Sequence, residues 1–570
     1  MTPRLTLNLG LRWDYERPFI ERFDRLTSVF DPTVLNPISD AAQAAYTRIL
    51  AQVLANPAQY PFGPQLAPLV PVSSFQVYGA QRFAGVDGQS RTVTRGDFRQ
   101  WQPRVGFAYR LRPQTVVRGG FGRFTQSSGV KGGQNGFSRS TTFIASQDSG
   151  LTPYDTLDRP FRGGILDPTG STLGPLTNLG QGVNWVNQDP GHPYSWEWSL
   201  HLQQEYKGWL FEVGYSRNKT YDIGADLQQN DIGFERWRTL RTPRFDASGR
   251  PLQRPFLSDE QVPNPFYQLP GVTGGRASSQ LISIYDLLRP LKAIGGQNRG
   301  GNPWGTNQYD SLQAKVQRRF KDGFSLLAAY TFSKLFEDTS FWGPEISGPI
   351  PEHKLGGEDR PHRLSVAPIY ELPFGRGKRF FDDMPRAADL VLGGWELSGQ
   401  YVVQSGAPVV FGTDSFYDGQ PFDLRRDQRT LDRWFDTSRF VKFPNQQDDL
   451  SLFPAWTGVH TLPGADYRPS GPNDPRNGVY ANFGNFVRRY PTRWANVRAH
   501  NTHELNLGLF KNFRIREGLK AQVRMEAFNA LNRPRFGGPN TDPASANFGR
   551  VTPAQQNTPR VLQVALKLSF

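Results

Sequence analysis

The ten residues VLQVALKLSF, at positions 561–570, decide the fold class of this chain. Apolar side chains occupy every second position, and polar or small residues fill the positions between them. Successive side chains of a β-strand point to opposite faces, so this segment presents one apolar face and one polar face. A length of about ten residues also suits a tilted strand that crosses a bilayer. The apolar set is Leu562, Val564, Leu566, Leu568 and Phe570.

Alternation of the same kind recurs along the whole chain. At the other end, LTLNLGLRWDY (5–15) places its leucine, tryptophan and tyrosine side chains on one face. Two alternating segments flank Lys207 and Gly208, which predicts a hairpin with a two-residue turn. We predict about twelve strands by this criterion. They lie near 3–15, 101–111, 114–126, 194–206, 209–217, 309–320, 324–334, 361–372, 392–405, 503–513, 519–529 and 560–570.

Aromatic residues stand at the ends of several apolar faces, where a membrane-spanning strand meets the boundary between lipid and water. The opposite faces carry Arg, Glu, Lys or Gln in nearly every strand, as the wet interior of a barrel does. We therefore expect an all-β fold, an antiparallel transmembrane β-barrel of the outer membrane. The residues expected to face lipid or to form the aromatic girdle are Leu5, Leu7, Leu9, Leu11, Trp13, Tyr15, Trp196, Trp198, Trp209, Phe211, Trp395 and Tyr401.

The connections between these segments alternate in length. Most connections within a pair are tight, with 373–391 as the exception, and those between pairs are long. Short turns on one side and long loops on the other are typical of outer-membrane barrels, and an even strand count returns both termini to the short-turn side. The long loops are large enough for extra hairpins. They run through 16–100, 127–193, 218–308, 335–360, 406–502 and 530–559.

Composition excludes several classes of protein. No stretch approaches the roughly 18 consecutive apolar residues that a membrane-spanning helix requires. The chain contains 0 Cys, which excludes disulfides, thiolate metal sites and cysteine nucleophiles. Its net charge of +15 is spread over the whole sequence, so we expect a solvated surface and no nucleic-acid partner.

Several short motifs, in this order, resemble the Oar-like branch of TonB-dependent outer-membrane receptors and transporters. Each motif is weakly specific, but together they cover almost the entire chain. They are LTLNLGLRW (5–13), PRVGFAY (103–109), YDSLQ (309–313), YTFSK (330–334), DRPHR (359–363), ELPFG (371–375), QSGAP (404–408), WFDT (434–437) and EAFNALN (526–532). The resemblance implies a barrel of about 22 strands, plugged by an N-terminal domain and energised through a segment before that plug.

The resemblance also implies what to expect of this particular chain. We expect residues 1–570 to form a partial barrel with about 12 to 16 of those strands, without the plug, a carboxypeptidase-like N-terminal domain or a signal peptide. Leu566, Leu568 and Phe570 are similar to the signal that the outer-membrane assembly machinery recognises. Further expected partners are outer-membrane lipid, lipopolysaccharide and an unknown bulky solute. The TonB complex would engage only through the missing N-terminal region.

No constellation in the sequence points to catalysis, a metal or a cofactor, and we expect no enzyme. His500 and His503 have helical zinc spacing but enter a strand. Residues 375–378 lack the spacing of a phosphate loop, and a calcium site at 446–449 would lack ligands. The arginine and aromatic residues of 425–439 could contact a ligand, but loop packing explains them as well.

Three functions follow from these patterns. The leading interpretation is a TonB-dependent receptor barrel that binds or passes a bulky solute. The first alternative is a passive porin-like or adhesin-like barrel without energy coupling. The second alternative is a secreted soluble β-protein that binds polysaccharide, which predicts that Leu5, Trp198 and Leu566 are buried against another sheet.

Overall fold

The computed structural model describes most of the chain, in a series of ranges separated by gaps. The described ranges are 4–129, 140–228, 230–233, 236, 240, 257–339, 353–411, 416–417, 421–441, 492–516, 518–542 and 545–570. The candidate calcium loop at 446–449 lies outside them.

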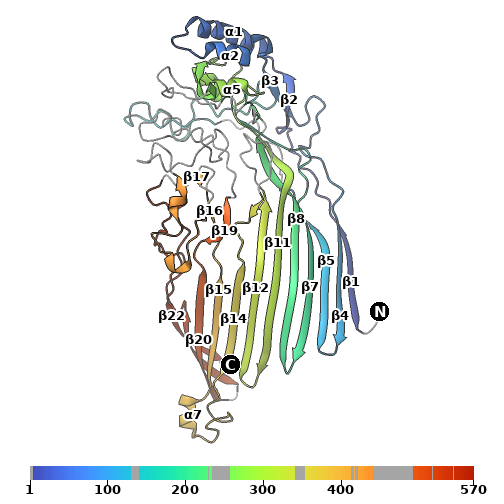
Figure 1. The fold of residues 1–570 in the computed structure, drawn as a ribbon, viewed down its shortest axis with the longest axis vertical. Helices are drawn as coiled ribbons and strands as arrows, with labels where there is room; N and C mark the ends of the chain where they lie inside the picture. Colours follow the sequence, from blue (N-terminus) through green and yellow to red (C-terminus); the bar gives the residue numbers. More distant parts are fainter. Residues whose placement is uncertain are drawn as a thin grey trace.

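One large curved sheet dominates the fold (Figure 1). It has 14 strands, of which twelve follow one another in chain order as antiparallel neighbours. These twelve correspond to the twelve segments that alternation predicts. They are β1 (Leu5–Trp13), β4 (Trp101–Arg112), β5 (Thr115–Thr125), β7 (Tyr194–Tyr206), β8 (Trp209–Gln228), β11 (Gln297–Lys321), β12 (Phe324–Asp338), β14 (His362–Glu371), β15 (Trp395–Gln404), β20 (Thr502–Arg516), β21 (Leu519–Phe528) and β22 (Val561–Ser569). Two short strands, β6 (Val183–Val186) and β13 (Lys354–Leu355), pair with β11 and β12.

The strand register carries one apolar face across the whole sheet. Leu7 of β1 pairs with Phe107 of β4, and at the far edge Val523 of β21 pairs with Leu566 of β22. Between them, Leu202 of β7 pairs with Val213 of β8 and continues the same face. A slip of one residue at any interface would turn a strand's apolar side chains to the polar face, so the alternation itself specifies this register.

Tight turns join the strands at the end of the sheet where both termini lie (Figure 1), as the even strand count predicts. Lys207 and Gly208 have φ values of +49° and +81°, and Asp322 and Gly323 have φ values of +53° and +77°. Two successive positive φ values are typical of the hairpin turn whose twist matches that of its strands. The exception, between β14 and β15, holds the helix α7 (Arg386–Leu392).

β8 and β11 extend farther than the sequence analysis predicts. The predicted strands at 209–217 and 309–320 are in fact 209–228 and 297–321. Irregularities in their pairing lie between Arg299 and Asn302, between Pro303 and Gly305, and between Gly305 and Asn307. Each shift interrupts the period of two, which explains why alternation does not reveal this part of the hairpin.

The long loops between β1 and β4, between β5 and β7, and between β8 and β11 fold together beyond the sheet, at the top of Figure 1. We call this unit the cap. The lengths of these loops allow extra hairpins, but the cap also contains helices. Its elements are β2 (Thr27–Leu35), α1 (Ser39–Ala55), α2 (Gly63–Leu69), η1 (Val72–Ser74), β3 (Tyr78–Phe83), η2 (Gly174–Leu176), η3 (Leu257–Asp259), β9 (Gln261–Pro263), α4 (Gly274–Ser278), β10 (Leu281–Ser283) and α5 (Ile284–Leu288).

A hydrophobic core holds the cap together. Tyr46 of α1 stacks on Phe75 with ring centroids 4.2 Å apart, and Phe75 lies 6.3 Å from Phe266. Leu179 and Ile284 are buried in the same core. Three connections far apart in the sequence therefore fold as one body.

A second apolar core lies near the loop ends of β14, β15 and β20. Phe411, Phe422, Phe435 and Phe440 pack around Val497 there, and we call this group the loop-end core. The elements that carry it are β16 (Pro408–Val410), β17 (Phe416–Tyr417), η4 (Arg426–Gln428), η5 (Thr437–Arg439), β18 (Phe440–Val441) and β19 (Arg493–Arg498).

The sheet is open, since β1 and β22 stand at its two edges and do not pair with each other. Among the described residues, no helix is both long enough and apolar enough to cross a membrane.

Candidate functional site

The register places the predicted membrane-facing residues that lie in strands on one face of the sheet. Tyr15 lies beyond the end of β1 at Trp13, so the strand register does not assign it to a face, and its place in the aromatic girdle stays a prediction. There its ring stacks on Phe98 at 4.5 Å, because the chain leaves the ladder after Trp13. The strand residues on this face are Leu5, Leu7, Leu9, Leu11, Trp13, Trp196, Trp198, Trp209, Phe211, Trp395 and Tyr401.

Aromatic rings border this apolar face at both ends of the strands. Near the loop end, Trp196 stacks on Phe121 at 5.0 Å and the Trp13 indole nitrogen donates to the Phe98 carbonyl at 3.0 Å. Near the turn end, the Trp209 ring lies 6.4 Å from that of Phe324. Two aromatic belts separated by an apolar band are the pattern of a membrane-facing surface.

No second sheet covers the apolar face within the described part of the chain. Leu566 is 65% exposed and Trp198 is 39% exposed, while Leu5 is half-buried among its own neighbours. A soluble sandwich would bury all three side chains, so its central expectation fails. Phe570, whose predicted role in assembly stays a prediction, is 97% exposed.

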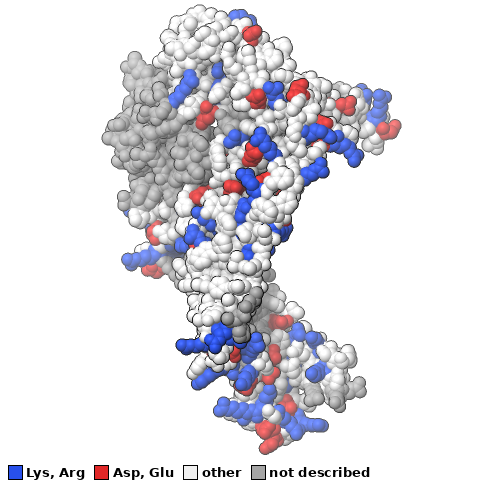
Figure 2. Space-filling view, turned by 90° about the vertical axis from the view of Figure 1, so that its right-hand side faces the viewer, with Lys and Arg blue, Asp and Glu red and all other residues white. Residues whose placement is uncertain are grey.

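The opposite face of the sheet is polar along its length. The Asn218 side-chain amide donates to Glu197 at 2.8 Å, and the Gln522 side-chain amide donates to Asn512 near the turn end at 2.8 Å. Figure 2 shows charged side chains gathered above and below a middle band that carries few of them. The sheet therefore has an apolar face and a polar face, with charged residues above and below a middle band.

Four of the motifs that carry the family resemblance meet at the loop ends of β14, β15, β20 and β21. Asp359 of DRPHR is buried, and its carboxylate forms a 2.5 Å ion pair with Arg498. The other oxygen of this carboxylate accepts the Leu335 amide at 2.8 Å. Arg498 also donates to the carbonyl of Gly406, in QSGAP, at 3.2 Å. One guanidinium thus joins three separate segments.

Trp434 and Phe435, of WFDT, connect the next loop to the same place. The Trp434 indole nitrogen donates to the Arg498 carbonyl at 2.7 Å, and Phe435 is fully buried in the loop-end core. Gly406 leaves no room for a side chain, because an added Cβ would lie 2.0 Å from the Ala499 carbonyl oxygen. The glycine of this motif therefore permits a close backbone approach.

The asparagines of EAFNALN shape the turn after β21. Asn529 and Asn532 have φ values of +46° and +49°, a conformation that asparagine tolerates better than most residues. The Asn529 side chain accepts the Arg533 amide at 3.0 Å and donates to the Thr558 carbonyl at 3.0 Å. It thereby positions the segment that leads into β22.

These segments enclose a pocket of about 670 Å³. Arg533 and Arg535 at its rim are exposed, and neither is ion-paired within the described ranges. The Arg535 guanidinium donates to the Thr502 hydroxyl at 3.3 Å. Arg498, Arg533 and Arg535 are not distinguished by any sequence pattern, although the last two follow EAFNALN closely.

His500 lies in this pocket, just before β20 begins. Its ring lies 4.4 Å from that of Trp434, and burial lowers its pKa. His503 lies in β20 beside Tyr401, whose hydroxyl is 3.5 Å from its Nδ1 atom. The described residues contain no cluster of three or more His, Cys, Asp or Glu that could hold a metal ion.

Two other candidates have structural roles. Residues 375–378 lie in the connection at the turn end, where the Lys378 ammonium pairs with Glu371 at 2.7 Å. In the arginine-rich loop, Arg429 donates to the Leu424 carbonyl at 2.8 Å and Trp434 packs against the loop-end core. Loop packing therefore accounts for part of that arginine and aromatic cluster.

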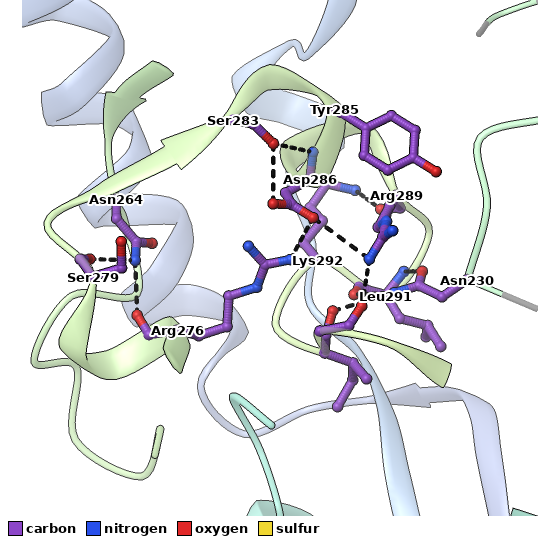
Figure 3. A network of polar contacts seen from close by, with 12 residues as sticks. Asn230, Asn264, Arg276, Ser279, Ser283, Tyr285, Asp286, Arg289, Leu291 and Lys292 are labelled. Carbon is purple, nitrogen blue, oxygen red and sulfur yellow. Dashed lines mark hydrogen bonds and ion pairs between the residues drawn. The ribbon is translucent and has the colours of Figure 1, made fainter. Parts of the chain in front are cut away.

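The cap contains a second pocket, of about 730 Å³, beside a polar network (Figure 3). Asp286 accepts from Arg276 at 2.7 Å and lies 3.5 Å from Arg289. Burial raises the pKa of Asp286, but the hydrogen bond and charge of Arg276 outweigh it, so the pKa is lowered overall. The Ser283 hydroxyl caps α5 by accepting the Asp286 amide at 3.1 Å. This network stabilises the cap and brings no catalytic pair together.

Comparison with known proteins gives one family match. A family model described as "Outer membrane beta barrel domain" matches residues 1–563. No curated protein matches the chain.

Several solved outer-membrane proteins share low similarity with the chain. The pyoverdine receptor FpvA from Pseudomonas aeruginosa PAO1 is 10% identical, with a TM-score of 0.32, over 87% of this chain and 39% of that one. The transporter YddB from Escherichia coli is 9% identical, with a TM-score of 0.34, over 83% and 41%. BauA, the ferric preacinetobactin receptor from Acinetobacter baumannii, is 7% identical, with a TM-score of 0.31, over 84% and 37%. The chain thus spans less than half the length of these proteins.

Proposed function

Because the chain belongs to the outer membrane beta barrel domain family, we propose that it forms the wall of a TonB-dependent receptor or transporter for a bulky solute. Its location is the outer membrane of a Gram-negative bacterium. The observation that carries the proposal is the single apolar face that the register continues from β1 to β22. The order of the sequence motifs supports the TonB-dependent class over a passive barrel.

The apolar face supplies the contact with lipid. Leu9 and Val564, near opposite edges of the sheet, are each 75% exposed. Apolar side chains this exposed are stabilised by hydrocarbon, whereas water disfavours them. The aromatic belts then lie at the two lipid–water boundaries, and lipopolysaccharide adjoins the loop end. Leu566, Leu568 and Phe570 would present the signal for the assembly machinery.

The open sheet requires further strands. A bilayer-spanning sheet with two free edges would leave backbone N–H and C=O groups unpaired in hydrocarbon, at a cost of several kcal/mol each. We propose that strands outside this sequence complete the barrel and that a plug and an energy-coupling segment belong to the same assembly. The TonB complex would act through those parts.

The loop-end pocket supplies a first contact for the solute. Its exposed guanidinium groups at Arg533 and Arg535 can donate paired hydrogen bonds to carboxylate or phosphate groups. A solute that carries negative charge therefore fits this rim best. No step of this function requires catalysis, in keeping with a family of barrels.

The test is solute uptake by cells that produce the protein together with its encoded plug and coupling parts. Fluorescent anionic solutes too large for general porins should accumulate, and an uncoupler of the proton gradient should abolish the accumulation. The double variant Arg533→Ala, Arg535→Ala should accumulate less solute, whereas Arg95→Ala, at a 71% exposed site in another loop, should not. Accumulation that ignores the uncoupler would favour the passive porin instead. Recovery of the protein in the soluble fraction would refute the membrane assignment.

A further inference from the structure

The connection between β14 and β15 is the one long connection at the turn end, and it is compactly folded. α7 lies in it, below the strands in Figure 1. The Asp389 carboxylate accepts the Arg376 amide at 2.9 Å and ties the start of the connection to the helix. Gly375 packs so closely on Gly393 that an added Cβ would lie 2.8 Å from its Cα. The connection is therefore closely packed and held by its own hydrogen bonds, and we call residues 372–394 the platform.

Two residues of the apolar face hold this platform in place. The Trp395 indole nitrogen donates to the Val391 carbonyl at 2.8 Å. The Lys511 ammonium donates to the Gly393 carbonyl and lies 3.5 Å from the Asp389 carbonyl, at the C-terminal end of α7. Both side chains point to the same face as Leu397 and Leu509. The helix is thus fixed at the turn-end border of the membrane-facing surface.

Lys511 is buried although it lies on the apolar face. It is 4% exposed, and its ammonium lies 5.4 Å from the Trp395 ring centroid and 5.1 Å from that of Phe513. A cation is stabilised both by aromatic faces and by the free carbonyls at a helix C-terminus. Both effects stabilise the Lys511 ammonium in its contact with the end of α7.

The apolar side chains of α7 have no cover within the described part of the protein. Leu390, Val391 and Leu392 are 55%, 65% and 51% exposed. A run of three exposed apolar residues is disfavoured in water unless another surface covers it. Phe380 and Phe381, in the same connection, are 46% and 63% exposed.

Basic residues accompany these apolar side chains. Arg379 and Arg386 are exposed, and neither forms an ion pair with another described residue. Apolar side chains next to free guanidinium groups match the boundary of a phospholipid layer, where acyl chains meet phosphates. Short turns of outer-membrane barrels face the periplasm, so the layer concerned is the periplasmic leaflet.

We infer that α7 and its connection form an interfacial anchor, which inserts Leu390, Val391 and Leu392 into the periplasmic phospholipid leaflet beside the barrel. This inference rests on the membrane placement in the proposed function but adds a contact that the strands do not provide. Its occupant is the phospholipid surface itself.

Residues 1–570 contain no cysteine, so each thiol introduced among them is unique within this part of the protein and allows a direct test. The variants are Val391→Cys as the probe, Leu202→Cys on the apolar face as the lipid reference, and Leu157→Cys, 99% exposed in a loop, as the water reference. Each is labelled with a polarity-sensitive fluorophore in the full-length protein. The proteins are reconstituted into phosphatidylethanolamine and phosphatidylglycerol vesicles. These contain lipids brominated near the headgroup for the probe at Val391, and lipids brominated deep in the acyl chains for the reference at Leu202.

The probe at Val391 should shift to shorter emission wavelengths, and brominated lipid should quench it several-fold more strongly than the probe at Leu157. Quenching at Leu202 without quenching at Val391 would overturn the anchor and leave the barrel assignment intact. Failure at both positions would overturn the membrane placement together with the anchor. A difference in quenching among the three positions would not result from misfolding of a variant, because all three substitutions replace exposed side chains.

Discussion

Arg498 and Asp359 lie 139 residues apart in the chain, and they form a 2.5 Å ion pair with a fully buried carboxylate. The pair joins the start of β14 to the segment that enters β20. Arg498 also bonds to the carbonyls of Asp359 and Gly406, at 2.9 and 3.2 Å. The arrangement of the loop-end pocket therefore depends on one charged pair whose carboxylate water does not reach.

We expect Asp359→Asn to open the loop-end pocket. The amide can still accept the Leu335 N–H, but Arg498 would keep a buried charge without its counter-ion, which costs about 3–5 kcal/mol. Hydrogen exchange at Leu335 and at the amides of 493–498 measures this loss. Asp189→Asn is the matched control, because its partner Arg95 and the carboxylate are 71% and 63% exposed, and such pairs contribute at most about 1 kcal/mol. Equal effects of the two variants would contradict the assigned role.

Neighbouring residues of β7 test the two faces of the sheet. Leu202 lies on the apolar face and is 47% exposed, whereas Gln203 lies on the polar face. Leu202→Arg should destabilise the inserted barrel by about 2–4 kcal/mol, because it places a charge near the middle of the bilayer. Gln203→Arg should change the stability little, since Glu212 is its polar neighbour. Urea titration of the barrel in phospholipid vesicles gives both values, and a larger loss at Gln203 would reverse the assignment of faces.

The sheet is predictable from sequence because each strand repeats a local signal. The period of two in 561–570 or 194–206 needs no knowledge of distant residues, and the positive-φ turn at Lys207 and Gly208 adds a second local signal. The signal fails where Pro303 and Gly305 shift the register, so the outer halves of β8 and β11 are missed.

The cap is harder to predict because its core is assembled from three distant connections. Tyr46 and Phe75 come from one connection, whereas Leu179 and Phe266 come from two others, and no local pattern relates the three. α1 does carry a local signal, since the buried residues Ala42, Tyr46, Leu50 and Val53 follow a helical period.

The loop-end pocket shows a different limit of sequence reasoning. The motifs are recognisable one at a time, but their convergence on Arg498 depends on the order of the strands. Arg498 itself belongs to no motif, and nothing in its neighbourhood distinguishes it from the other arginines of the chain.

Asp286 should make the cap sensitive to acid. Its pKa is lowered in the folded protein, since the bonds and charges of Arg276 and Arg289 outweigh burial. The stabilisation is therefore complete above the unfolded carboxyl pKa of about 4, and is lost as the pH falls through the lower folded value. Amide exchange in α5 should accelerate over that range. Asp286→Asn should remove the pH dependence, whereas Asp40→Asn, at an exposed site on α1, should retain it.

His500 should make the stability of the loop-end pocket depend on pH for a different reason. Charged partners lower the pKa of Asp286, whereas burial lowers the pKa of His500. Burial lowers the pKa of its imidazole, and Nε2 has no hydrogen-bond partner among the described residues. The neutral ring packs between Trp434 and Phe536, at 4.4 and 5.3 Å.

Above the unfolded histidine pKa of about 6.5 both states are neutral, and the ring does not oppose folding. As the pH falls below that value, the unfolded chain binds a proton that the folded pocket resists, so the pocket loses stability. We expect its NMR titration midpoint below 6.5, together with faster amide exchange around 498–501 in acid. His500→Phe should abolish this acid-induced exchange and keep the ring packing. A midpoint above 6.5 would show instead that an acidic partner, and not burial, controls this histidine.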